Sequence, residues 1–123
     1  MVVNLIIVII INNFLKILFM RARPDINPLI VEVGYSFPSG HSMVAMGFYG
    51  YLIYLTWDIT KHHSKTFLKV AMTVILTCII ILIGLSRIYL GVHFASDVIA
   101  GFVLSIAYLI CYITIMFKLI KLK

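Results

Sequence analysis

Four chemically active side chains lie close together between two long apolar stretches of the sequence. They are Ser86, Arg87, His93 and Asp97. An ionisable residue at the edge of a membrane span costs free energy unless it has a partner or a task, so each is a candidate functional residue. If the chain is helical from about residue 93, His93 and Asp97 lie four residues apart on one helix face. A carboxylate so placed can fix the tautomer of the imidazole and stabilise its charged form.

Two other clusters carry compatible chemistry. One runs from Lys16 to Pro24 and includes Arg23, and the other comprises Pro38, Ser39, Gly40 and His41. Arginine and lysine supply fixed positive charge, and the guanidinium fork matches the oxygens of a phosphate. Ser39 is placed as a helix N-cap, so the backbone N–H groups that follow it would form an anion site. Each cluster alone also has an ordinary structural explanation. Together they predict a phosphate cradle with two histidines, one suited to nucleophilic attack and one to proton transfer.

The composition predicts that lipid surrounds these clusters. Of 123 residues, 63% are hydrophobic and 11% are charged, and a soluble chain of this length could not bury so much apolar surface. We therefore expect one membrane-embedded domain over residues 1–123, an all-α polytopic bundle with the core motifs at 16–97. The apolar stretches predict four transmembrane helices, at about 1–20, 41–57, 70–85 and 94–117. A signal peptide is the competing interpretation of the first stretch, but no positive charge precedes it and no cleavage site follows.

Charge is distributed unequally between the two sides that four spans would create. One side collects six lysines and one aspartate, and the other collects four basic and three acidic residues. Since cytoplasmic loops carry an excess of lysine and arginine, we expect the lysine-rich side to be cytoplasmic. His41 and His93 would then face outward from the plasma membrane.

Other residues that could carry chemistry favour ordinary roles. His62 and His63 are adjacent, but no third ligand is nearby, so a solvated turn is the better interpretation and no metal or cofactor is expected. Cys78 and Cys111 lie inside apolar runs and are assigned no chemistry. The net charge of +6 could suggest nucleic acid, but the cations lie at membrane edges, so we expect no nucleic-acid partner.

The three clusters together resemble the signature of the type 2 phosphatidic acid phosphatase superfamily. That signature reads K-x6-RP, then PSGH, then SR-x5-H-x3-D, and its fixed positions are filled here by Lys16, Arg23, Pro24, Pro38, Ser39, Gly40, His41, Ser86, Arg87, His93 and Asp97. The resemblance implies a metal-independent phosphatase acting on lipid phosphates in the bilayer. His93 would attack phosphorus to form a phosphohistidine, while Asp97 orients its ring. His41 would protonate the departing oxygen and then activate water.

The resemblance also implies which groups hold the transferred phosphate. Lys16, Arg23, Ser39, Gly40 and Arg87 would contact its equatorial oxygens, where charge develops during transfer. Ser86 would only position the adjacent arginine or end the third helix.

The residues say less about which lipid is the substrate and about whether the chain is a full-length enzyme. By analogy with bacterial members we expect undecaprenyl diphosphate first, then phosphatidylglycerol phosphate or phosphatidic acid. Membrane members usually have six spans, so the chain is expected to be a naturally short or a truncated form. The alternatives are a membrane protein that keeps a phosphate-binding pocket without catalysis, a vanadium haloperoxidase, and a channel or transporter. The oligomeric state stays open.

Overall fold

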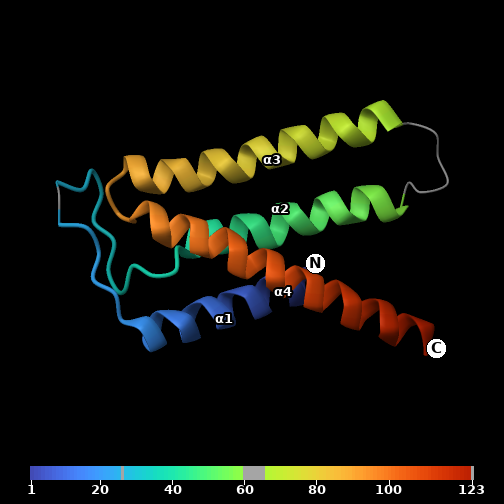
Figure 1. The fold of residues 1–123 in the computed structure, drawn as a ribbon, viewed down its shortest axis with the longest axis horizontal. Coiled ribbons are helices and arrows are strands. Elements are labelled where there is room, and N and C mark those ends of the chain that lie inside the picture. Colours follow the sequence, from blue (N-terminus) through green and yellow to red (C-terminus); the bar gives the residue numbers. More distant parts are fainter. Residues whose placement is uncertain (26, 60–65, 123) are drawn as a thin grey trace.

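The structure, a computed structural model, describes residues 1–25, 27–59 and 66–122. Within these ranges the chain forms four helices and no strand: α1 (Val2–Phe19), α2 (Gly40–Ile59), α3 (Thr66–Tyr89) and α4 (Ala95–Lys121). The predicted all-α bundle is confirmed (Figure 1). α1 lies within its predicted span, α2 and α4 extend a few residues beyond theirs, and α3 extends by four residues at each end.

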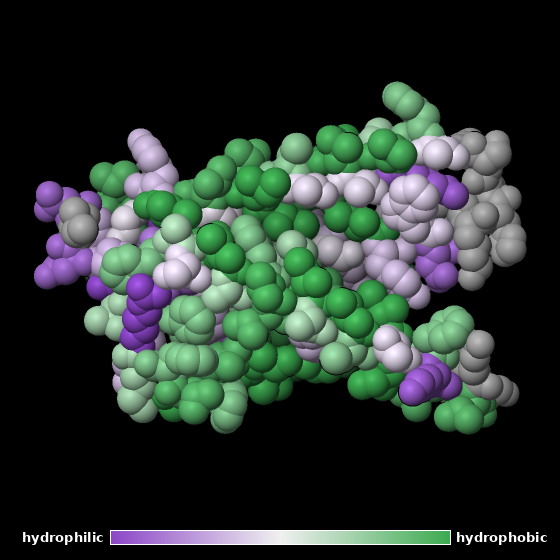
Figure 2. Space-filling view, viewed as in Figure 1, coloured by the Kyte–Doolittle hydropathy of each residue, from purple (hydrophilic) through white to green (hydrophobic). Residues whose placement is uncertain are grey.

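Three of the described helices are long and apolar enough to cross a membrane, namely α1, α3 and α4 as far as Leu119. The remaining predicted span, residues 41–57, forms α2, which is less apolar and is not among these three. A physical reason is that α2 packs against all three other helices, whereas α1 and α3 make no contact with each other in the described part of the chain. Much of its surface therefore meets protein rather than lipid. Figure 2 shows hydrophobic residues over the middle of one face of the bundle and hydrophilic residues toward its ends.

Glycines allow the helices to approach closely. A Cβ atom on Gly47 of α2 would lie 2.8 Å from the Val8 side chain of α1, and one on Gly84 of α3 would lie 2.5 Å from Phe102 of α4. Small residues at helix contacts are typical of membrane bundles, where backbones pack without a hydrophobic driving force. Asn4 adds a polar link, because its Nδ2 donates to the Gly47 carbonyl over 2.8 Å. These contacts join α1 to α2 and α3 to α4.

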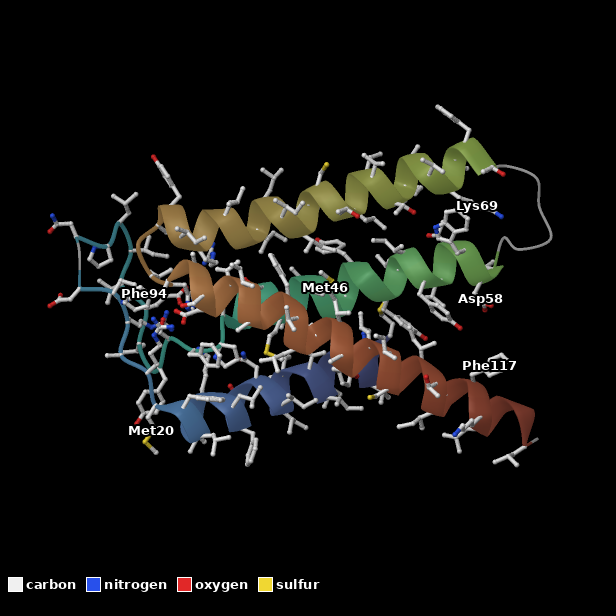
Figure 3. All side chains as sticks on the ribbon, viewed as in Figure 1. Met20, Met46, Asp58, Lys69, Phe94 and Phe117 are labelled. Atoms are coloured by element: carbon white, nitrogen blue, oxygen red, sulfur yellow. The ribbon has the colours of Figure 1, made fainter. Side chains whose placement is uncertain are left out.

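One end of the bundle collects all three sequence clusters. It holds the ends of α1 and α3, the starts of α2 and α4, and the connecting residues 20–25, 27–39 and 90–94 (Figure 1). In Figure 3, Met20 and Phe94 lie at this end, while Asp58 and Lys69 lie at the opposite end. His62 and His63, together with Lys61 and Lys65 of the lysine-rich side, lie outside the described residues.

Candidate active site

His93 lies between α3 and α4 with a buried serine beside its ring. The predicted helix begins only at Ala95, yet His93 still reaches its expected neighbour, with Nδ1 3.5 Å from Asp97 Oδ2. That separation exceeds a good N–H···O hydrogen bond. Ser36 Oγ lies closer, 3.3 Å from Nδ1, and it donates a hydrogen bond to Asp97 Oδ2. The carboxylate therefore reaches the imidazole through Ser36, a residue that the sequence analysis did not select.

Asp97 is fully buried, and its charge is compensated on both oxygens. The Arg21 guanidinium lies 2.8 Å from Oδ1. The backbone N–H of Phe94 donates to Oδ2 over 2.9 Å, as expected for an acidic residue in the first turn of a helix. Arg21 also lies 4.3 Å above the Phe94 ring centroid, a cation–π contact that holds the guanidinium over the carboxylate. In the sequence, Arg21 is one of the four basic residues on the side expected to face outward, and no motif position indicates this further role.

The other ring nitrogen of His93 faces a cation and the cavity. Arg23 Nη1 lies 3.3 Å from His93 Nε2 and also donates to the Val92 carbonyl over 3.0 Å. Because a guanidinium can only donate, Nε2 must be the acceptor, and Nδ1 carries the proton. Burial, and with it the positive charges of Arg23 and Lys16, lowers the pKa of His93 to about 4, against the opposing effect of Asp97 and Glu32. The ring is thus neutral near pH 7, with its lone pair on Nε2.

Three cations reach the same end of the bundle from three segments. Lys16, near the end of α1, donates to the Tyr35 carbonyl over 2.6 Å. Arg23, in the connecting segment, donates from Nε to the Gly34 carbonyl over 3.1 Å. Arg87, near the end of α3, has its Nε 3.2 Å from the hydroxyl of Ser86. Ser86 therefore contacts the arginine, and α3 continues past it to Tyr89.

A carboxylate lies among these cations. Glu32 Oε2 is 2.9 Å from Arg23 Nη1, and Oε1 is 3.3 Å from Arg87 Nη1. The same carboxylate lies 3.8 Å from His93 Nε2 and 4.0 Å from His41 Nδ1. An anion is thus already present between both histidines and two arginines. The only signal in the sequence is that Glu32 is one of two acidic residues in a proline-containing loop.

The start of α2 has the predicted cap. Ser39 immediately precedes the helix, is fully buried, and accepts a hydrogen bond at Oγ from the Ser42 backbone N–H over 3.4 Å. Its hydroxyl also accepts from the Ser42 hydroxyl over 3.0 Å, so it contacts the helix rather than the cavity. Gly40 and His41, the first two residues of α2, line the cavity. A Cβ on Gly40 would lie 3.1 Å from Asn12 Oδ1, so a larger residue there would press against α1.

The cavity has a volume of about 660 Å³ and two chemically different parts. Its polar part is lined by Lys16, Arg23, Glu32, His41 and His93. The rest is mainly apolar and includes Leu5, Ile9, Val44, Ala45, Phe48, Tyr49 and Ile83, from α1, α2 and α3. Among the described residues, no group of three His, Cys, Asp or Glu side chains is arranged to hold a metal ion. The arrangement can bind a phosphate group at one end and an apolar chain along the helices.

Comparisons with known proteins agree with the motifs. The model of the PAP2 superfamily matches residues 1–121. Phosphatidylglycerophosphatase B of Bacillus subtilis (strain 168) is 43% identical over 95 residues, which is 77% of this chain and 46% of that protein. A crystal structure described as the first transmembrane PAP2 type phosphatidylglycerolphosphate phosphatase, from Bacillus subtilis, superposes with a TM-score of 0.74 at 37% identity. That superposition covers 85% of this chain and 51% of the other.

The chain spans about half the length of these two relatives. The family match nevertheless extends over nearly all of its residues, and it includes every position of the three motifs predicted from the sequence. The chain therefore belongs to the PAP2 superfamily.

Proposed function

We propose that this chain is a membrane phosphatase that releases inorganic phosphate from a lipid. The observation that carries the proposal is the position of His93 Nε2. This nitrogen lies 3.3 Å from Arg23 Nη1 and beside the Glu32 carboxylate, which forms ion pairs with both Arg23 and Arg87. A phosphoryl group in place of the Glu32 carboxylate would face a neutral imidazole and two guanidinium groups. These are the requirements for nucleophilic attack with electrostatic stabilisation of the equatorial oxygens.

The reaction would proceed in two steps without a metal. His93 Nε2 attacks phosphorus, and the bond from phosphorus to the lipid oxygen breaks, which gives a phosphohistidine. His41, which lines the same cavity, donates a proton to the departing oxygen. In the second step His41 removes a proton from the water that attacks the phosphohistidine, and inorganic phosphate leaves.

Phosphatidylglycerol phosphate is the substrate that we propose first. Both relatives are named for that activity, and this places it ahead of undecaprenyl diphosphate, the first expectation from the sequence. The apolar walls supplied by Phe48 and Tyr49 suit a lipid chain, which could stay in the bilayer while its headgroup reaches His93. The excess of lysines on the opposite side supports an outward-facing site at the plasma membrane.

Phosphate release by the purified full chain in detergent tests this proposal. Phosphatidylglycerol phosphate, phosphatidic acid and undecaprenyl diphosphate are supplied separately, each with a chelator present. The parent should release phosphate from at least one lipid, and the His93→Gln variant from none. A phosphoenzyme that is stable in alkali and labile in acid should form only in the parent.

Two results would contradict the proposal. Phosphate release by His93→Gln at the parent rate would remove His93 as the nucleophile. Binding of inorganic phosphate by a folded parent that hydrolyses none of the lipids would favour the non-catalytic alternative.

A further inference from the structure

We propose that Ser36 is a positioning residue that fixes the tautomer of His93, acting between the imidazole and Asp97. The inference rests on the proposed function for its catalytic meaning. Ser36 lies outside the three motifs, in the segment that joins α1 to α2. Its side chain is fully buried, so it is not a substrate contact.

Distances place the serine hydroxyl, rather than the carboxylate, as the partner of Nδ1. Ser36 Oγ is 3.3 Å from His93 Nδ1, whereas the nearer Asp97 oxygen is 3.5 Å away. The serine is also fixed through its backbone, since its N–H donates to the Arg21 carbonyl over 2.8 Å. Arg21 in turn holds the other oxygen of Asp97. The hydroxyl, the carboxylate and the guanidinium thus form one connected unit behind the ring.

The hydrogen bonds from His93 through Ser36 to Asp97 can run in only one direction if every donor is to meet an acceptor. Arg23 donates to Nε2, so the single ring proton is on Nδ1 and is donated to Ser36 Oγ. The serine hydroxyl then gives its own proton to Asp97 Oδ2. In the opposite tautomer an N–H at Nε2 would face the N–H of Arg23, with two donors and no acceptor. Arg23 on one side of the ring and the serine hydroxyl on the other therefore favour the same tautomer, in which the Nε2 lone pair faces Arg23 and the cavity.

The bonding changes require no proton to move along this unit. The Nε2 electron pair forms the bond to phosphorus, and the electron pair of the broken P–O bond leaves with the lipid oxygen, which takes its proton from His41. The imidazole keeps its Nδ1 proton and becomes positively charged. Ser36 then accepts a charge-assisted hydrogen bond, backed by the buried carboxylate. Its contribution is orientation and stabilisation of that charge.

Nitrogen NMR of the histidine rings tests the inference directly. The full chain, labelled with ¹⁵N-histidine in detergent, should show His93 as the Nδ1–H tautomer, with its signal identified by its loss in His93→Gln. In Ser36→Ala the Nδ1 proton loses its acceptor and only Arg23 still favours this tautomer, so part of the population should change to Nε2–H. Formation of the phosphoenzyme should slow by about tenfold, the effect of losing one hydrogen bond of ordinary strength, with little change in KM.

Two further variants separate positioning from loss of packing. Ser36→Cys fills a similar space with a weaker hydrogen-bonding group, so it should also yield mixed tautomers, and it decides the matter if Ser36→Ala does not fold. Ser105→Ala is the matched control, because Ser105 is equally buried but donates to the Met43 carbonyl in the helix core. It should leave the His93 spectrum unchanged.

The inference is overturned if His93 stays entirely in the Nδ1–H tautomer in the folded Ser36 variants, because Asp97 would then act on the ring directly. The ring spectrum does not depend on turnover. A parent that hydrolyses no lipid would therefore count against the proposed function alone.

Discussion

Two groups of polar side chains meet at His93, and they are organised in opposite ways. The buried cluster consists of the buried Ser36, His93 and Asp97 together with the partly exposed Arg21 that contacts Asp97. The cavity cluster consists of Lys16, Arg23, Glu32, His41 and Arg87. The His93 side chain is 1% exposed, whereas that of His41 is 55% exposed. In the buried cluster the hydrogen bonds run from protein to protein, so its geometry needs no ligand. In the cavity cluster the arginines hold a carboxylate, so their partner must change when phosphate binds.

This difference separates orientation from binding. In the proposed mechanism, the buried cluster would determine which nitrogen of His93 attacks, and the cavity cluster would determine which substrate it attacks. Changes in the first should lower kcat with little effect on phosphate affinity, and changes in the second should alter both.

The largest effect is expected from Asp97→Asn. Whichever way the new amide lies, its NH₂ group faces either the guanidinium of Arg21 or the region of Ser36 and the Phe94 N–H, so the unit behind the ring loses its direction. We expect kcat to fall by about 10³- to 10⁴-fold, the range found when an orienting carboxylate of a catalytic histidine is replaced. Single-turnover formation of the phosphoenzyme measures it. Asp58→Asn, at the opposite end of the bundle, is the control, and a loss below tenfold would contradict the role.

A smaller effect is expected from Arg87→Gln in the cavity cluster. The guanidinium that contacts Glu32 would no longer stabilise charge on the transferred phosphoryl oxygens. The expected loss of kcat is about 10²- to 10³-fold. Arg87→Lys keeps the charge without the fork and should recover only part of it. Steady-state kinetics on the lipid that the parent hydrolyses fastest measure this loss. Equal activity of Arg87→Gln and the parent would exclude a contact between Arg87 and the transferred phosphoryl group.

His41→Gln should discriminate between kinds of leaving group. A monoester releases a poor alkoxide that needs a proton, so the variant should lose about 10²-fold on phosphatidylglycerol phosphate or phosphatidic acid. A diphosphate releases a phosphate, which needs less help, so the loss on undecaprenyl diphosphate should be smaller. The measurement is the ratio of the loss of activity on the monoesters to the loss of activity on the diphosphate. Equal losses on both classes would indicate that His41 binds phosphate rather than transferring a proton.

The smallest effect concerns pH. Attack requires neutral His93, whose pKa is lowered to about 4, so protonation of His93 should cause no fall in kcat/KM on acidification from neutrality until the pH approaches that value. Lys16 is among the charges that lower this pKa. Lys16→Gln should therefore let the pKa rise and move the acid limb of the profile to higher pH, by less than about one unit. A limb that moves to lower pH would contradict the assignment of that limb to His93.

The sequence carried enough information for the helices and the motif residues. Long apolar stretches predicted the helices, and the spacing of His93, Arg87 and His41 predicted a common site, which the structure brings to one end of the bundle. The lower hydropathy of α2 could not be interpreted in advance, since it reflects contact with three neighbours that only the fold reveals.

Ser36, Arg21 and Glu32 illustrate what sequence patterns do not contain. All three lie in the segment between α1 and α2, which has no helical or strand period. Their roles depend on contacts with residues about 55 to 76 positions away, such as Arg21 with Asp97 and Glu32 with Arg87. Those contacts follow from the packing of the helices that the segment connects, so local chemistry alone could not select them.

The carboxylate of Glu32 has a consequence for turnover. With it in place, the unliganded pocket is not a set of bare cations repelling one another, because the arginines already share a counter-ion. In the proposed reaction, binding of a phosphorylated lipid and release of inorganic phosphate would each exchange one anion for another. Only the difference between the two anions would then contribute to affinity, so the product would be held less tightly and would leave faster.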